Sequence, residues 1–312
     1  MCRRQIKFYA LCICVFINFT CERKLDQIPD TGRKIVINGL TTTDSVLNVH
    51  VGRSAYINGG FTSTGENDVD SANVKVYLNN NQIDSLYRNP WYVQDNWRLF
   101  NTSNYRSKSV IPQSGMMYKV VVKLPAMPDA SASVIIPDLV KILKVDTISL
   151  LMSNGNFGIK CTIEFDDPAI ATNFYMVDVR EVINEDYFVG LDNNLGFNCD
   201  DPIVEEKLYT GEKTEGIAFS DKLLNGQKHH LPIIIDRRSI GNQTYATQQI
   251  VCFRLYSINK EYFNYIHDLN LYNKKLGNPL ASPVIVNSNV TDGYGMFSGA
   301  AVSSYQITFQ KF

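Results

Sequence analysis

Apolar and polar residues alternate with a period of two along much of the chain. In FGIKCTIEF (157–165), every second residue from Phe157 to Phe165 is apolar. SVLNVHV (45–51) and YKVVVKL (118–124) show the same pattern. Because successive side chains of a strand point to opposite faces, this pattern predicts strands with one face on a core and one in water. It favours antiparallel sheets, since parallel strands are apolar on both faces.

The predicted fold is mainly β, with two antiparallel, sandwich-like (immunoglobulin-like) domains. No series of helices alternates with the strands, which argues against an α/β fold. Prolines interrupt LPAMPDASASVIIPDL (124–139), and proline is poorly tolerated in central strands. We therefore expect a β-sandwich domain over 34–138 and a larger β-rich domain over 139–312.

One helix is predicted in the second domain, near 259–276, from NKEYFNYIHDLNLYNKKLG. Asn259 is a good N-cap residue and Gly277 a good helix stop. The helix has an acidic residue in its first turn and lysines in its last, as the helix dipole favours. An apolar stripe predicts packing on the core and consists of Tyr262, Phe263, Ile266 and Leu269.

The first twenty residues have the pattern of a secretory signal. Basic residues precede IKFYALCICVFINF (6–19), an apolar run too short to span a bilayer, which takes roughly 20 residues. Cys21 follows, and then a polar tether reaches residue 33. This arrangement resembles a bacterial lipoprotein signal, in which the cysteine is acylated. We therefore expect residues 1–20 to be removed and Cys21 to anchor the protein in the outer membrane of the cell envelope. The sequence is compatible with either the periplasmic or the surface face of that membrane.

Charge and cysteine content limit other interpretations. The formal net charge is −1 and the pI is near 6.4, so the chain has no basic field and we expect no nucleic-acid partner. Beyond the predicted anchor the cysteines are Cys161, Cys199 and Cys252. Their spacing is compatible with one disulfide and one thiol, or with three thiols.

Catalytic and metal-binding patterns are missing from the sequence. Among four histidines, His229 and His230 are adjacent and so point to opposite faces of a strand. H-E-x-x-H, C-x-x-C and G-x-S-x-G do not occur. Asp166 and Asp167 are also adjacent, which is unsuitable for a glycosidase carboxylate pair. LDNNLGFNCDDP (191–202) offers oxygen ligands without EF-hand order. We expect no catalytic residue, metal or cofactor, and we lean against an enzyme.

Aromatic residues gather in YRNPWYVQDNWRLFNTSNYRS (87–107). Trp91, Tyr92 and Trp97 could stack on a sugar ring or contact a partner, as exposed aromatic residues do at interfaces. We favour the alternative that they close the end of the first sandwich, because most aromatic side chains are buried.

A glycine-rich stretch, SNVTDGYGMFSGAA (288–301), resembles a nucleotide-binding loop only superficially. Its glycines are spaced G-x-G-x-x-x-G, and the residues after them, VSSYQITFQ (302–310), alternate like a strand and not like a helix. The preceding PVIVNSN (283–289) is also a predicted strand. We therefore predict a corner between strands, where glycine allows a positive φ.

Several segments are together similar to the Bacteroidota lipoproteins of domain-of-unknown-function family 4249. They are KIVINGLTTTDSVLNVHVGRS, VDSANVKVYLNN, SGMMYKVVVKLP, SVIIPDLVKI, IAFSDKLLNGQKHHL, FRLYSINKEYFNYIHDL and PVIVNSNVTDGYGMFSGAAVSSY. Genes for such proteins often neighbour outer-membrane TonB-dependent transporters. The resemblance implies an envelope location and a link to uptake, but no biochemical activity.

The expected function is therefore binding. The protein is expected to be an accessory to a TonB-dependent transporter or part of a surface assembly. The alternative is a glycan-active hydrolase or a glycan-binding module, for which Trp91, Tyr92 and Trp97 would be the contact residues.

Overall fold

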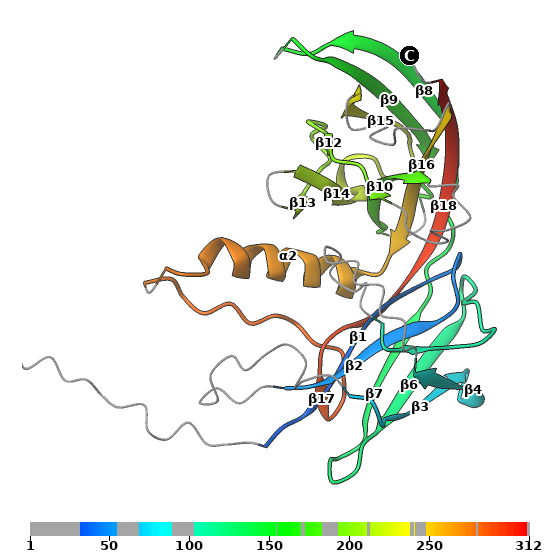
Figure 1. Cartoon of the computed structure of the whole chain (residues 1–312), viewed down its shortest axis with the longest axis vertical. Coiled ribbons are helices and arrows are strands. Elements are labelled where there is room, and N and C mark those ends of the chain that lie inside the picture. The colour runs from blue at the N-terminus through cyan, green and yellow to red at the C-terminus, as the bar shows by residue number, and fades with distance from the viewer. Residues whose placement is uncertain are drawn as a thin grey trace, which may run out of the picture. The chain divides into compact units, whose positions relative to one another are not determined.

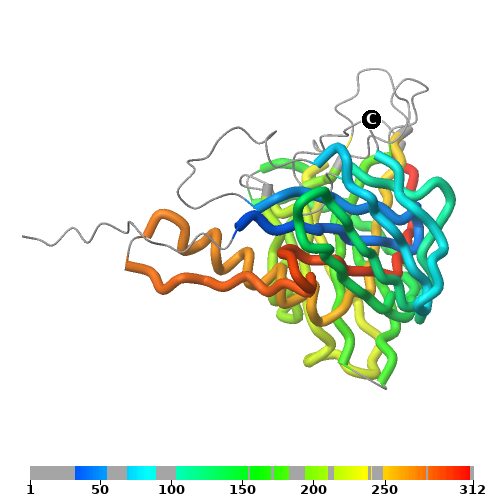
Figure 2. The backbone as a smooth tube through the Cα atoms, turned by 90° about the horizontal axis from the view of Figure 1, so that it is seen from below, coloured from blue at the N-terminus to red at the C-terminus, as the bar shows by residue number. Residues whose placement is uncertain are grey.

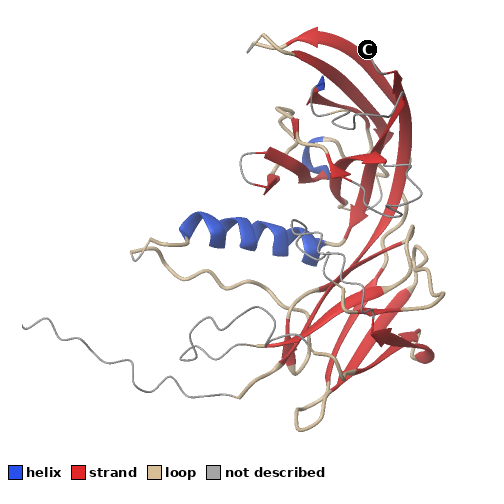
Figure 3. Cartoon of the chain, viewed as in Figure 1, coloured by secondary structure: helices blue, strands red, loops and turns tan. Residues whose placement is uncertain are grey.

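β-Strands form most of the described chain, as the alternating pattern predicted (Figure 3). The computed structural model describes residues 32–54, 69–88, 103–153, 155–169, 172–182, 193–210, 213–237, 240, 248–278 and 280–310. From Arg33 onward these residues belong to one unit (Figure 1).

The larger of two sheets has the strand order β13-β14-β10-β16-β18-β1-β2-β5-β4-β3-β6-β7. Its first strands come from the second half of the chain: β13 (Glu206–Thr210), β14 (Lys213–Ser220), β10 (Phe174–Val182), β16 (Gln248–Ile258) and β18 (Phe297–Gln310). The others come from the first half: β1 (Ile35–Thr42), β2 (Asn48–Arg53), β5 (Tyr105–Arg106), β4 (Asn81–Arg88), β3 (Asn73–Leu78), β6 (Met117–Lys123) and β7 (Ala130–Ile135). Two short strands pair beside this path, β11 (Asn193–Asn194) on β10 and β17 (Gly293–Tyr294) on β1.

The smaller sheet is antiparallel and has the order β12-β15-β9-β8. Its strands are β12 (Phe197–Asn198), β15 (Lys228–Asp236), β9 (Phe157–Asp166) and β8 (Ile142–Leu151). On β9 the predicted inward face is buried from Ile159 to Phe165. The prediction that Phe157 also points inward is wrong, because this residue is 65% exposed. The outer end of the β8–β9 hairpin carries Phe157 beyond the packed core.

The long strand β18 joins the two halves of the larger sheet. It pairs with β16 antiparallel over the whole length of β16, and with β1 in parallel from Gly39 opposite Phe297. β17 also pairs with β1 in parallel. The larger sheet is therefore mixed and departs from the predicted antiparallel pairing at β1, whose two parallel partners come from the far end of the chain.

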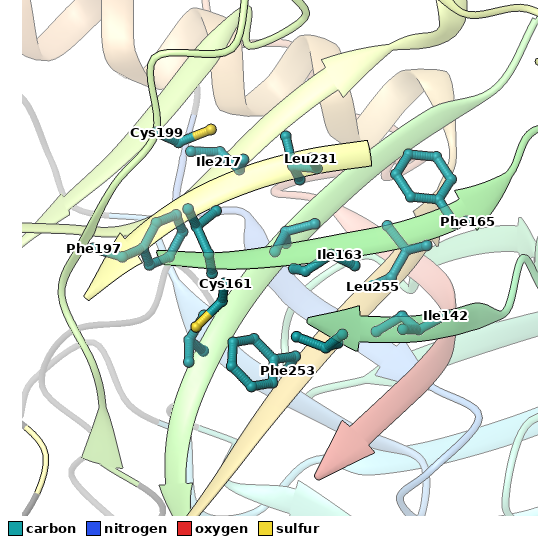
Figure 4. Packing of buried hydrophobic residues seen from close by; sticks show 14 of the residues in the cluster. Ile142, Cys161, Ile163, Phe165, Phe197, Cys199, Ile217, Leu231, Phe253 and Leu255 are labelled. Carbon is teal, nitrogen blue, oxygen red and sulfur yellow. The ribbon is translucent and has the colours of Figure 1, made fainter. Parts of the chain in front are cut away.

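Two large hydrophobic cores lie against the sheets. The first contains the inward residues of the first half, including Leu47, Val49 and Val51, which the sequence placed on one face. The second packs β9 and β15 on β10, β14 and β16, as the side chains in Figure 4 show. β18 contributes Phe297 to the first core, and its Ile307 packs against the second. A two-domain division at residue 138 stays a prediction.

Helix α2 (Lys260–Lys275) is the α-helix of the described chain, and it begins and ends as predicted. Asn259 occupies the N-cap position but makes no side-chain cap hydrogen bond. Its amide instead donates to the Ile135 carbonyl at 2.7 Å. Tyr262, Phe263 and Ile266 are buried against a third, smaller core. In the described residues no helix is long and apolar enough to cross a membrane.

The glycine-rich stretch forms the predicted corner between β17 and β18. Gly295 has φ +110°, and a Cβ on it would lie 2.2 Å from the Ile37 carbonyl oxygen. The predicted strand at 283–289 is wrong, because this segment forms no sheet ladder. It returns along α2, where Asn287 donates its backbone and side-chain N–H groups to Asp268.

Candidate functional site

The residues predicted to anchor the protein and to contact a ligand lie outside the described part of the chain. They are Cys21, Trp91, Tyr92 and Trp97. Their roles remain predictions.

Cys161, Cys199 and Cys252 are buried, and they form no disulfide. Their spacing was compatible with one disulfide and one thiol or with three thiols, and the structure has the second arrangement. Cys161 and Cys199 lie in the second core (Figure 4). Burial raises the pKa of the Cys161 thiol from 9.0 to about 12. It is therefore protonated at neutral pH and is not a nucleophile, because the thiolate is the reactive form.

The adjacent histidines point to opposite faces of β15, as predicted. His229 Nε2 lies 3.3 Å from Asp201 Oδ2, in a largely buried position. His230 Nδ1 lies 3.7 Å from Glu164 Oε2 and is exposed. Each imidazole therefore has a carboxylate neighbour of its own, and the two do not meet at one metal.

A third histidine, halfway along α2, contacts a carboxylate. His267 Nδ1 lies 2.5 Å from Glu206 Oε1, and Asn270 donates to the other oxygen of the same carboxylate at 2.7 Å. The interaction ties the helix to β13. Within the described residues no three His, Cys, Asp or Glu side chains are grouped as a metal site requires.

Of the adjacent aspartates, Asp166 is exposed and Asp167 is buried. Asp167 accepts hydrogen bonds from the Tyr175 hydroxyl at 2.5 Å and from the Gly226 backbone N–H at 2.8 Å. Burial raises the pKa of the Tyr175 hydroxyl, and the neighbouring Asp167 raises it further. Both carboxylate oxygens thus hold the structure together, and the two aspartates do not form a catalytic pair.

Sequence reasoning missed a buried ionic cluster on the face of the larger sheet. Tyr256 and Arg180 donate to the Asp178 carboxylate at 2.7 Å and 3.0 Å. Arg254 lies over the Tyr256 ring and donates to Asp44 at 2.6 Å. The cluster holds two cations and two anions, so its charges balance, and Asp44 is its one exposed member. A signal was present, since Asp178 and Arg180 stand two apart, and so on one face, within a β10 whose only other charged residue is Glu181.

One hollow of about 330 Å³ lies where β10 begins and β16 passes into α2. Its lining consists of Pro137, Asp138, Thr172, Asn173, Phe174, Ser257, Ile258, Asn259 and Lys260. This volume is at the lower end for ligand pockets. Two of its amides already make hydrogen bonds, Asn173 with Pro168 and Asn259 with Ile135. The lining has no histidine or cysteine, and its Ser257 hydroxyl accepts a hydrogen bond from the Val140 backbone N–H at 3.2 Å.

The best candidate for a functional surface is the end of the β8–β9 hairpin, here termed the hairpin tip and defined by Ile148, Leu151 and Phe157. All three side chains are about two-thirds exposed. Leu151 and Phe157 face each other across the two strands, and Ile148 lies on the opposite face of β8. Among the described strands β8 is the edge of its sheet. An exposed apolar edge strand is a ready site for pairing with another chain.

The hairpin is locally well formed. Met152 donates to the Asn156 carbonyl at 2.8 Å, and Gly155 donates back to Met152 at 3.0 Å with φ +80°. Gly158 leaves space for the Met152 side chain, because a Cβ there would lie 2.7 Å from its sulfur. The exposed residues are therefore presented by an ordered ladder.

Among the described residues, the fold and the hairpin tip define a mainly β protein whose edge strand β8 carries exposed apolar side chains at its outer end. The chain matches the family model described as Domain of unknown function (DUF4249) over residues 22–306, and it belongs to that family. This is the family that its segments resemble. The chain matches no curated protein.

Proposed function

We propose that this protein is a lipid-anchored binding protein of the bacterial outer membrane, accessory to a TonB-dependent transporter or to a surface assembly. The N-terminal pattern ending at Cys21 supports the anchor. The hairpin tip is the observation that carries the binding role, because large apolar side chains there have no core to enter. In finer detail, we propose that each half of the chain is a sandwich-like domain, divided near residue 138.

The hairpin tip suits a protein partner better than a small ligand. It is an edge and not a cavity, and an edge strand binds extended segments through its backbone groups while apolar side chains add affinity. Fully burying one such side chain contributes about 1.5–3 kcal/mol. Leu151 and Phe157 together would therefore contribute a large share of the free energy of a moderate complex.

The first test is affinity isolation of the natively processed protein from its own membranes, beside a Cys21→Ala variant. We expect a TonB-dependent transporter to co-purify with the natural chain and to be depleted with the variant. Recovery of the natural chain alone would contradict the transporter role. Equal membrane attachment of Cys21→Ala would contradict the anchor.

The second test addresses the surface. Leu151→Ser combined with Phe157→Ser should lower recovery of the partner at least about tenfold, since it removes two apolar contacts. Ile111→Ser is the matched control, because Ile111 is an exposed isoleucine outside the hairpin. Equal recovery with both variants would show that the partner binds elsewhere, and then Trp91, Tyr92 and Trp97 are the next residues to substitute.

A further inference from the structure

A second exposed apolar feature lies at the C-terminal end of α2, far along the chain from the hairpin tip. The last turn of the helix and the segment that returns from it project from the sheets in both views (Figures 1 and 2). We term residues 271–286 the arm; residue 279 lies outside the described part. The base of the arm is held by Asn270, which donates to Glu206 and to the Lys207 carbonyl, and by Asn287, which donates to Asp268.

The arm exposes aliphatic side chains that a water-facing turn would not require. Leu280 is 93% exposed, Ile285 is 85% exposed, and Leu276 and Tyr272 are also exposed. The first half of α2 buries its apolar residues on the sheet, whereas the arm extends past that sheet. Burial in α2 is confined to Tyr262, Phe263 and Ile266.

The charge of the arm is one-sided. It contains Lys274 and Lys275 and no acidic residue, whereas the whole chain has a net charge of −1. Lys274 is exposed in the last turn of α2, where Leu276 and Leu280 follow closely. Local hydrogen bonds shape the turn, from Leu276 to the Asn273 carbonyl and from Ala281 to the Asn278 carbonyl.

We propose that the arm inserts its leucines into the interfacial region of a membrane that carries anionic lipid. Exposed aliphatic residues beside lysines and a tyrosine are the composition of segments that lie in the headgroup region. Each lysine near an anionic surface strengthens binding by about fivefold. The inference uses the proposed lipid anchor only to bring the chain to the membrane, and it adds a second, reversible contact that would orient the folded unit.

The arm favours lipid over a protein partner because its apolar residues are spread along a narrow projection. Leu276, Leu280 and Ile285 belong to a helix end and a returning segment without a sheet ladder. They offer no edge for strand pairing, unlike the hairpin tip. A lipid interface needs no matching shape, and it accepts such a projection directly.

The experiment places an environment-sensitive fluorophore at Ser282→Cys in the full, acylated chain. The thiols at Cys161, Cys199 and Cys252 are buried, which favours labelling at the new position. The protein is reconstituted into vesicles of phosphatidylcholine with phosphatidylglycerol, and separately of phosphatidylcholine alone. A probe at Ser149→Cys, an exposed serine of the hairpin, is the control.

We expect the emission of the Ser282 probe to shift to the blue in the anionic vesicles, and a lipid-borne quencher to reach it. The shift should be smaller without phosphatidylglycerol, and high salt should reduce it by screening the lysines. Leu276→Ser with Leu280→Ser should abolish the blue shift. Lys274→Glu with Lys275→Glu should make the shift smaller in vesicles with phosphatidylglycerol than in vesicles of phosphatidylcholine alone. The Ser149 probe should stay in water throughout.

The outcomes separate the arm from the anchor. Co-flotation with phosphatidylcholine vesicles reports the anchor at Cys21, and its loss would count against the proposed function alone. An unshifted Ser282 probe in anionic vesicles would overturn the arm inference whether or not the anchor is present. A shift seen only in native membranes, and not in vesicles, would also overturn it and assign the arm to a protein partner.

Discussion

Asp178 shows how much a single residue can depend on distant partners. It lies in β10, but its carboxylate accepts hydrogen bonds from Arg180 on the same strand and from Tyr256 on β16. Removing one partner of a buried ionic group leaves the other charge uncompensated. The cluster is therefore a place where small changes should have large effects on stability.

Asp178→Ala should lower the free energy of unfolding by about 3–5 kcal/mol, because Arg180 would remain buried without its carboxylate. Asp146→Ala is the matched control. It removes an exposed pair in which Lys144 Nζ lies 2.7 Å from Asp146, and such pairs contribute less than about 1 kcal/mol. Urea denaturation at neutral pH measures both. Similar losses in the two variants would show that the cluster is not the stabilising element inferred here.

The Cys161 thiol predicts a pH dependence. Its pKa is about 12 in the folded chain, against an ordinary value of 9.0. Above pH 9.0 the unfolded thiol ionises while the folded one stays protonated, so the free energy of unfolding should fall as the pH rises toward 12. Cys161→Ala should show a shallower alkaline decline in urea denaturation series. An equal alkaline decline of the unfolding free energy in both proteins would show that the Cys161 thiol is not its source.

At the scale of elements, the β17–β18 corner and the β8–β9 hairpin illustrate two outcomes of the same sequence rules. Glycine at the corner was predicted to allow a positive φ, and Gly295 has one. On β9, alternation predicted an inward Phe157. The packed core ends before this residue, so its side chain is exposed. The turn at Gly295 and the strand β9 were predicted correctly, whereas the strand at 283–289 and the inward packing of Phe157 were not.

Gly295→Ala should destabilise the protein by more than about 2 kcal/mol, because strain at positive φ adds to a contact of 2.2 Å with the Ile37 carbonyl oxygen. Gly277→Ala provides the comparison. Gly277 also has a positive φ, +83°, but a Cβ there would meet no atom within 4 Å. It should lose only about 1 kcal/mol. Thermal unfolding of both variants checks the prediction, which fails if their losses are equal.

At the scale of the whole molecule, β18 is the strand on which both cores depend. Its Phe297 is fully buried in the first core, and Ile307 packs against the second. Its backbone pairs with β1 on one side and β16 on the other. Losing β18 from either half would open the larger sheet at its middle.

The described halves should therefore unfold together. Phe297→Ala in the first core and Phe253→Ala in the second should each lower stability by about 3–5 kcal/mol and shift one common transition. Scanning calorimetry, with loss of structure followed by circular dichroism, measures this. Two separate transitions, each moved by only one variant, would contradict this coupling of the two halves through β18.

The sequence by itself determined that the described chain is mainly β, the inward faces of several strands, and the position of helix α2. Leu47, Val49 and Val51 lie on one buried face, and α2 begins after Asn259, because alternation and capping depend only on neighbouring residues. Tertiary structure alone decided that β1 pairs in parallel with β18, that Asp178 meets Tyr256, and that Phe157 and Leu280 stay exposed. These features depend on which distant segments meet and where a core ends, and local periodicity carries no information about either.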